Sequence, residues 1–143
     1  MTSDDVVVAP FVEAAFACAR CGREAARVSV RPRGMGDPPG VPKVPGAVDS
    51  DRVVIEAGQL STVMGGTEIE AAIPAALRAL GTADARALFA AHFEMAPFWC
   101  PKCGASYCGE EWVVWPIYAD DYPGWFEELR GRCPSGHERM LRD

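Results

Sequence analysis

Residues 100–112 read CPKCGASYCGEEW, and their three cysteines stand at spacings that are typical of metal ligands. Cys100 and Cys103 belong to a CPKCG turn, in which two thiolates can point at one ion while Gly104 lets the backbone fold beneath it. Cys108 follows, but the position that would hold its Cys or His partner is occupied by Glu111. The stretch therefore predicts metal binding and raises the question of whether a carboxylate completes a second site.

Two further ligand clusters lie outside this stretch. Residues 18–22 read CARCG, and residues 133–137 read CPSGH. In a reducing compartment such clusters indicate metal binding, with a redox pair or simple burial of the thiols as alternatives. We therefore expect one or two zinc ions and the following candidate ligands: Cys18, Cys21, Cys100, Cys103, Cys108, Glu111, Cys133 and His137.

The tail of the chain is expected to form a short helix, with Cys133 at its cap and Pro134 at its first position. Residues four apart then share one face of the first helical turn. A CPxCG turn, a β-hairpin and such a helix follow the order of a treble-clef zinc finger, and residues 100–143 resemble that class. The resemblance implies a closed structural site whose ligands are Cys100, Cys103, Cys133 and His137.

The order of the clusters also resembles the cross-brace of RING-type and B-box-type domains. In that arrangement a second ion joins Cys18, Cys21 and Cys108. Those families place Cys or His where this chain has Glu111, and a carboxylate is an accepted zinc ligand, so Glu111 is the leading candidate for the fourth position. The alternatives are no second ion, a water molecule, or an oxygen or nitrogen ligand from elsewhere, such as His92 or Glu110.

A competing pairing stays open at this point. Cys18 and Cys21 could join Cys100 and Cys103 in a ribbon of four thiolates. Three ligands with an open position would then remain, namely Cys108, Cys133 and His137. Two thiolates and one imidazole are the ligand set of some catalytic zinc sites, so this pairing would favour a metalloenzyme.

Between the clusters, the sequence predicts a small body of strands and helices. Strand patterns occupy residues 26–31, 52–57 and 59–64, and a Pro- and Gly-rich loop fills 32–50. An apolar stripe predicts one helix that begins at Thr67 or at Pro74, and a second helix that runs from Thr82 to about His92. We expect one α+β domain over residues 1–143, with a body at 22–99 inserted between the first two knuckles and a treble-clef-like region at 100–143.

Aromatic residues gather after Cys108. Residues 111–129, EWVVWPIYADDYPGWFEEL, predict two strands around a turn at 120–124. Packing in the core around the metal is the expected role of these rings, and an exposed patch for a partner is the alternative. The acidic residues of this segment are expected to be solvated, and docking of a basic partner is the alternative.

Charge limits the classes of function. The net charge of −6 disfavours sequence-independent binding of nucleic acid, although five arginines lie between Arg20 and Arg33, where we expect a charged edge strand. Asp4 and Asp5 argue against an export signal, and no stretch reaches the ~18 apolar residues of a membrane span. We therefore expect a cytoplasmic protein that makes no membrane contact.

The leading hypothesis is a non-enzymatic, zinc-stabilised interaction module with a protein partner. A metalloenzyme or thiol-redox protein is the alternative, with a three-ligand site formed by Cys108, Cys133 and His137 or by Cys18, Cys21 and Cys108. A further alternative is a regulator that binds nucleic acid through the arginines of residues 20–33. The oligomeric state and the pathway do not follow from the sequence.

Overall fold

A four-stranded antiparallel sheet forms the body of the computed structural model, which describes residues 8–122 and 124–143. Its strands lie in chain order: β1 (Val12–Ala17), β2 (Glu24–Arg31), β3 (Arg52–Glu56) and β4 (Thr62–Met64). The strands predicted at 26–31 and 52–57 are confirmed. Of the third predicted strand, 59–64, only residues 62–64 form a strand, and its first two residues belong to a short 3-10 helix, η3 (Gly58–Leu60). Asp4 and Asp5, and Pro123 in the predicted turn, lie outside the described residues.

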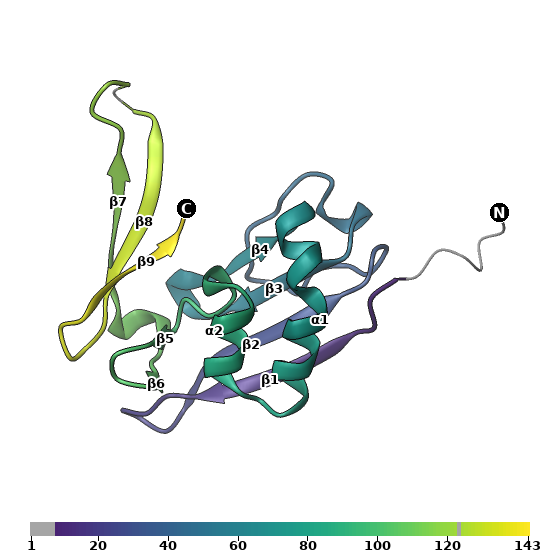
Figure 1. The fold of residues 1–143 in the computed structure, drawn as a ribbon, viewed down its shortest axis with the longest axis horizontal. Coiled ribbons are helices and arrows are strands. Elements are labelled where there is room, and N and C mark those ends of the chain that lie inside the picture. Colours follow the sequence, from purple (N-terminus) through teal and green to yellow (C-terminus); the bar gives the residue numbers. More distant parts are fainter. Residues whose placement is uncertain (1–7, 123) are drawn as a thin grey trace, which may run out of the picture.

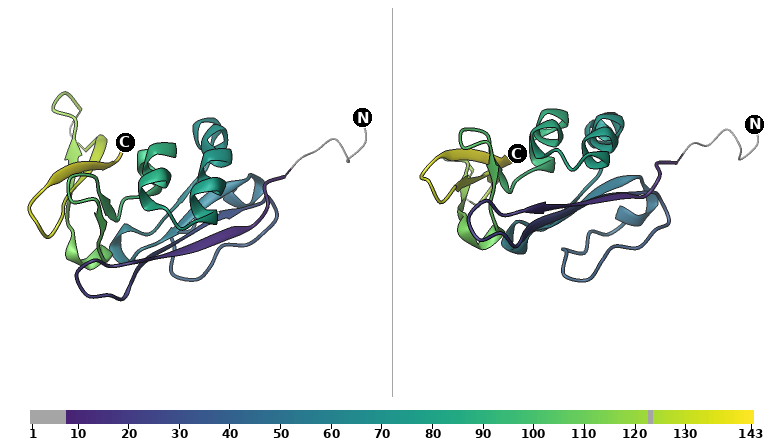
Figure 2. Two further views of the ribbon diagram at one scale, coloured as in Figure 1. Left: turned by 60° about the horizontal axis from the view of Figure 1, so that its bottom comes forward. Right: turned by 90° about the horizontal axis from the view of Figure 1, so that it is seen from below.

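Two helices, α1 (Thr67–Gly81) and α2 (Ala85–Ala91), cover one face of this sheet (Figures 1 and 2). The α1 helix begins at Thr67 and contains Pro74, so a start at Pro74 is wrong. Thr82 ends α1 instead of capping α2; the N-cap is Asp84, whose carboxylate accepts a 3.0 Å hydrogen bond from the Ala87 amide. The helical stripe packs on the sheet through buried residues that include Ile69, Ile73, Ala76, Ala79 and Leu80.

The loop between β2 and β3 lies on the opposite side of the sheet from the helices (Figure 2). Arg52 tethers it, because its fully buried guanidinium donates to the Asp37 carboxylate at 2.7 and 2.9 Å and to the carbonyl of Met35. The loop also contains a short 3-10 helix, η2 (Ala47–Asp49). The sheet is thus covered on both faces, which is why Val53, Val54 and Ile55 are all buried.

The second half of the chain forms two smaller sheets. A short hairpin of β5 (Trp99–Cys100) and β6 (Ala105–Ser106) carries the CPKCG turn. Three longer strands, β7 (Val113–Tyr118), β8 (Phe126–Arg132) and β9 (Glu138–Arg142), form an antiparallel sheet whose β7–β8 hairpin projects from the body (Figure 1). Two 3-10 helices, η4 (Phe93–Met95) and η5 (Gly109–Glu111), complete the elements of this half. The α+β class is therefore confirmed.

The expected C-terminal helix is wrong, because residues 138–142 form the strand β9. Gly136 has a φ of 91°, and the amide of Cys133 donates to the carbonyl of His137 at 2.9 Å, so the chain reverses direction here instead of winding onward. Beyond the turn, Arg139 and Leu141 alternate with more exposed residues, as on a strand with one buried face. The end of the chain therefore lacks the helix of a treble clef.

The β2 strand is not the charged edge that the arginines suggested. β1, which was not predicted from the sequence, lies beside β2, and the edges of the sheet are β1 and β4. Arg27 on β2 donates to Glu13 of β1 at 2.8 Å and to Glu24 at 2.7 Å. This arginine is therefore paired within the chain. Within the described residues, no helix is both long and apolar enough to cross a membrane.

The two halves of the chain meet where η3 contacts η5. The side-chain amide of Gln59 donates to the carbonyls of Gly109 at 2.8 Å and Trp112 at 2.7 Å. The backbone amide of Gln59 donates to the Glu110 carboxylate at 3.0 Å. Gly109 lies so close to η3 that a Cβ atom there would stand 2.0 Å from the Ala57 carbonyl oxygen. Only glycine fits at this contact.

We expect Gly109→Ala to destabilise the protein strongly. The clash is with backbone, which cannot move aside as a side chain can, so the cost should reach or exceed the roughly 3 kcal/mol at the upper end of ordinary overpacking. That loss corresponds to a fall in Tm of about 10 °C for a chain of this size. Thermal unfolding followed by circular dichroism measures it. The control is Gly36→Ala, whose added Cβ meets no atom within 4 Å; equal melting of the two variants would contradict the described contact.

Candidate metal centres

The first candidate site joins two turns that are distant in sequence. Cys100 and Cys103 come from the β5–β6 turn, and Cys133 and His137 come from the turn between β8 and β9. One ligand atom from each lies within 4.8 Å of the others. The His137 Nδ1 atom stands 3.6, 3.2 and 3.6 Å from the sulfurs of Cys100, Cys103 and Cys133, respectively.

These separations match a tetrahedral ion. With Zn–S of about 2.3 Å and Zn–N of about 2.0 Å, neighbouring sulfurs lie about 3.8 Å apart, and sulfur and nitrogen about 3.5 Å apart. The sulfurs of Cys103 and Cys133 are separated by 3.9 Å. The group therefore has the composition and the spacing of a closed, four-ligand site.

The two turns hold their ligands in the same way. The amide of Gly104 donates to the carbonyl of Cys100 at 2.8 Å, and the amide of Gly136 donates to that of Cys133 at 2.9 Å. In each turn the first sulfur also accepts a 3.4 Å hydrogen bond from the backbone amide of the second ligand. Amide donors directed at sulfur stabilise its thiolate form, which is the form that binds metal.

The thiols of this group differ in acidity. Burial raises the pKa of Cys100 to about 11, whereas a hydrogen bond from Tyr107 is the main cause that lowers the pKa of Cys103 to about 6. Without an ion, the group would thus hold both thiol and thiolate at neutral pH. Metal binding would displace the remaining protons.

A buried arginine lies beside the first group. Arg139 is 8% exposed and donates to the carbonyls of Ala96 at 2.7 Å, Trp99 at 2.8 Å and Phe93 at 3.1 Å. Among the described residues, no carboxylate lies within ion-pair distance of it. Burial lowers its pKa to about 10, and the charge of Cys100 opposes that shift. Three thiolates around a divalent ion carry a net charge of −1, which this guanidinium would balance.

The second candidate site joins the β1–β2 turn to η5. It contains Cys18, Cys21, Cys108 and Glu111, whose ligand atoms also lie within 4.8 Å of one another. The sulfurs of Cys21 and Cys108 are 3.4 Å apart, and the Cys18 sulfur lies 2.9 Å from Glu111 Oε1. The amide of Ala19 donates to the Ser106 carbonyl at 2.8 Å, so the β1–β2 turn is fixed against the second half of the chain.

The second group is more exposed to solvent than the first. Cys21 is exposed, and a backbone hydrogen bond from Arg23 is the main cause that lowers its pKa. Burial raises the pKa of Cys108 to about 12. Arg20 is largely exposed and lies 3.7 Å from Glu111 Oε2, where it offsets part of the negative charge.

The other fourth-ligand candidates lie elsewhere. Glu110 accepts the hydrogen bond from the Gln59 amide, and the His92 ring pairs with Glu68 at 2.7 Å and accepts from the Glu94 amide at 3.2 Å. Neither side chain belongs to either group. Among the described residues, Glu111 is the carboxylate that accompanies the three thiols.

The competing pairing is not the arrangement in the structure. The two CxxC turns do not share one group, and Cys108 does not lie with Cys133 and His137. The eight candidate ligands instead fall into the two sets of four that the treble-clef and cross-brace resemblances implied. The ribbon of four thiolates, and with it the open site at Cys108, is therefore set aside.

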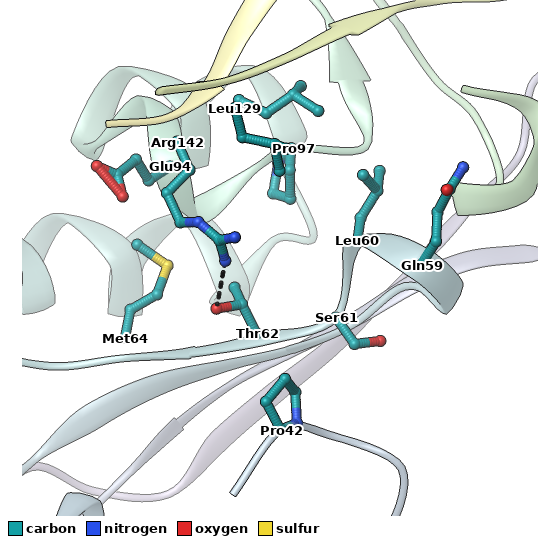
Figure 3. A pocket seen from close by; sticks show the side chains of 11 residues that line it. Pro42, Gln59, Leu60, Ser61, Thr62, Met64, Glu94, Pro97, Leu129 and Arg142 are labelled. Atoms are coloured by element: carbon teal, nitrogen blue, oxygen red, sulfur yellow. Dashed lines mark hydrogen bonds between the residues drawn. The ribbon is translucent and has the colours of Figure 1, made fainter. Parts of the chain in front are cut away.

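A cavity of about 260 Å³ lies between the β4 edge and the three-stranded sheet, and it contains none of the candidate ligands (Figure 3). Arg142 crosses it and donates to the Thr62 hydroxyl at 3.4 Å, while Leu60, Met64 and Leu129 supply apolar walls. Pockets for small molecules usually measure roughly 300–1,000 Å³. We interpret this cavity as a packing gap between the two halves of the chain.

A family model described as "Domain of unknown function (DUF8328)" matches residues 9–143. The chain belongs to this family. No curated protein matches the chain, and no solved structure does. The description of DUF8328 names no ligand or activity, so the function has to be inferred from the two groups of side chains.

Two arginines near the groups of this DUF8328 chain were not predicted from the sequence to lie there. Arg139 lies in the tail that was expected to form a helix, and Arg20 is one of the five arginines of residues 20–33. Only the fold shows that one lies beside Cys100 and the other beside Glu111. A buried arginine without an acidic neighbour has no signature in a single sequence.

Proposed function

We propose that this chain is a zinc-stabilised protein-interaction module with two structural zinc ions and no catalytic role of its own. The observation that carries the proposal is the assembly of the side chains into two sets of four, with ligand types that zinc prefers. A full set of four protein ligands characterises a structural site, whereas a catalytic site keeps one position open.

The positions of the two groups support a structural role. The first group links the β5–β6 turn to the β8–β9 turn, and the second links the β1–β2 turn to η5. Each would therefore cross-link segments that lie far apart in the chain and that pair through few backbone hydrogen bonds. The proposal requires reduced thiols, as they are kept in the cytoplasm.

Charge supports a protein partner over nucleic acid. With six thiolates and two zinc ions, the net charge would fall from −6 to −8. A surface of this sign repels phosphate, so the interaction is expected to involve protein.

We expect the purified, reduced protein to carry close to two zinc ions per chain. Emission spectrometry on protein prepared without chelator measures the metal, and thiol titration before and after denaturation measures how many cysteines the ions protect. All six thiols should react slowly in the native protein and fully in the denatured protein with a chelator. A folded protein without metal would overturn the proposal.

A further inference from the structure

The β7–β8 hairpin projects from the body (Figure 1). Four aromatic side chains at the end of this hairpin are exposed. Tyr118 is 53% exposed, Tyr122 and Trp125 are each 68% exposed, and Phe126 is 40% exposed. We call the end of the hairpin that carries these four residues the aromatic arm. The expectation that the rings of this segment fill the core holds for Trp112, which is 2% exposed, but is wrong for the arm.

The rings of the arm are ordered relative to one another. Tyr118 and Phe126 are partners across the β7–β8 ladder. Tyr122 and Trp125 pack with ring centroids 6.4 Å apart and an angle of 54° between their planes. Large exposed rings that are held by a hairpin present apolar area at a low cost in side-chain entropy, as at the centre of many protein interfaces.

The arm also carries unneutralised acidic groups. Asp120, Asp121 and Glu127 are exposed and form no ion pair among the described residues. Glu128, by contrast, pairs with Arg130 at 3.0 Å. No Lys or Arg occurs between residues 116 and 129, so the end of the hairpin combines aromatic faces with negative charge alone.

We propose that the aromatic arm is a docking surface for a cationic, arginine-bearing segment of a partner protein; this inference rests on the proposed function. A guanidinium can stack on an aromatic face and donate to a carboxylate at the same time. The chain itself shows this chemistry at the base of the arm, where Arg132 lies 5.5 Å from the centroid of Trp115. The charge of the arm selects a basic partner and opposes binding to a second copy of the same acidic arm.

The same charges argue against the other surfaces that aromatic residues recognise. Phosphates of nucleic acid and anionic lipid headgroups would be repelled by Asp120, Asp121 and Glu127. A neutral bilayer could still accept exposed Trp and Tyr side chains at its interface. Binding to vesicles therefore serves as an outcome that contradicts the inference.

The test uses the full-length, zinc-loaded protein labelled with ¹⁵N and a short capped peptide of alternating Arg and Leu. Matched peptides replace Arg with Lys or with Glu. Binding to phosphatidylcholine vesicles is measured in a separate experiment. We expect the Arg peptide to shift amide resonances of β7, β8 and their connection at low salt, and the Lys peptide to bind more weakly. The Glu peptide and the vesicles should cause no shift. Higher salt should weaken binding, because exposed charges are screened.

Variants locate the effect on the arm. Trp125→Ser should weaken binding of the Arg peptide at least about tenfold, as expected for a central aromatic contact. Asp120→Asn with Asp121→Asn should weaken it and flatten the salt dependence. Val44→Ser is the control for Trp125→Ser, because Val44 is also an exposed apolar residue. Asp49→Asn with Glu70→Gln is the control for the double Asp variant, because it removes two exposed acidic charges elsewhere on the chain. These should bind as the parent does.

Several results would overturn the inference: no shift at a millimolar concentration of the Arg peptide, shifts outside the β7–β8 hairpin, equal binding of the Glu peptide, or binding to vesicles. Zinc content is measured on every sample. If the protein carries two zinc ions but does not bind the Arg peptide, only the proposed docking surface is contradicted. A folded protein without zinc contradicts the proposed function, whatever the peptide does.

Discussion

A Cys133→Ser variant is expected to lose one zinc ion and, with it, the fold of the three-stranded sheet. Cys133 is buried and lies between β8 and β9, where its sulfur is within 4.8 Å of the sulfurs of Cys100 and Cys103 and of a ring nitrogen of His137. Binding of a structural zinc ion contributes on the order of 10 kcal/mol, which is comparable with the whole stability of a domain. Loss of the ion would also remove the negative charge that balances buried Arg139 in the folded state, which further favours unfolding of the sheet.

The measurement combines zinc content with limited proteolysis and circular dichroism. Metal should fall from two ions to one, and cleavage should appear within residues 100–143. His137→Ala should behave alike, because both residues serve the same ion. Glu138→Gln is the matched control: it changes the neighbouring residue and removes only an exposed ion pair with Arg132. Native-like protease resistance in both ligand variants would rule out a shared closed site.

Local spacing was sufficient to predict which residues gather. A CxxCG turn directs two side chains to one side through the backbone of a few residues, so Cys18 with Cys21, and Cys100 with Cys103, could be predicted from the sequence. The pairing between clusters depends on contacts across the fold. The sequence left two pairings open, and only the structure shows that Cys108 lies with Cys21, 3.4 Å away, across 87 residues of chain.

The wrong predictions concern segments in which pairing with a distant strand overrides the local conformational preference of the sequence. Pro134 suits a first helical turn, but the positive φ of Gly136 reverses the chain and β9 gains a hydrogen-bonded partner in β8. Residues 12–17 lack a strict alternation of polar and apolar residues, so their strand could not be recognised before β2 was seen beside them. Arg27 was misplaced on an edge for the same reason, since its partner Glu13 belongs to that unrecognised strand.

Substituting Glu111 tests whether the second group is a closed site. We expect Glu111→Ala to lower the affinity for the second zinc ion. The loss should exceed the roughly 10- to 100-fold that substitutions of outer-shell residues cost, because a direct ligand would be removed. Glu111→His should retain the ion or bind it more tightly, since imidazole is a stronger zinc ligand in a set with three thiolates. The first ion should be unaffected, because its four ligands belong to a separate group. Competition with a chromophoric chelator resolves the two affinities.

Glu110→Ala is the control that separates ligation from charge. It removes a neighbouring carboxylate of the same 3-10 helix, but that carboxylate accepts from the Gln59 amide and lies outside the group. It should cost stability at the contact between η3 and η5 and leave the affinity of the second ion unchanged. If Glu111→Ala instead binds both ions as the parent does, Glu111 only accepts the hydrogen bond from Cys18, and water holds the fourth position. An exchangeable water on zinc can be activated as a nucleophile, so that result would favour a metalloenzyme over the interaction module.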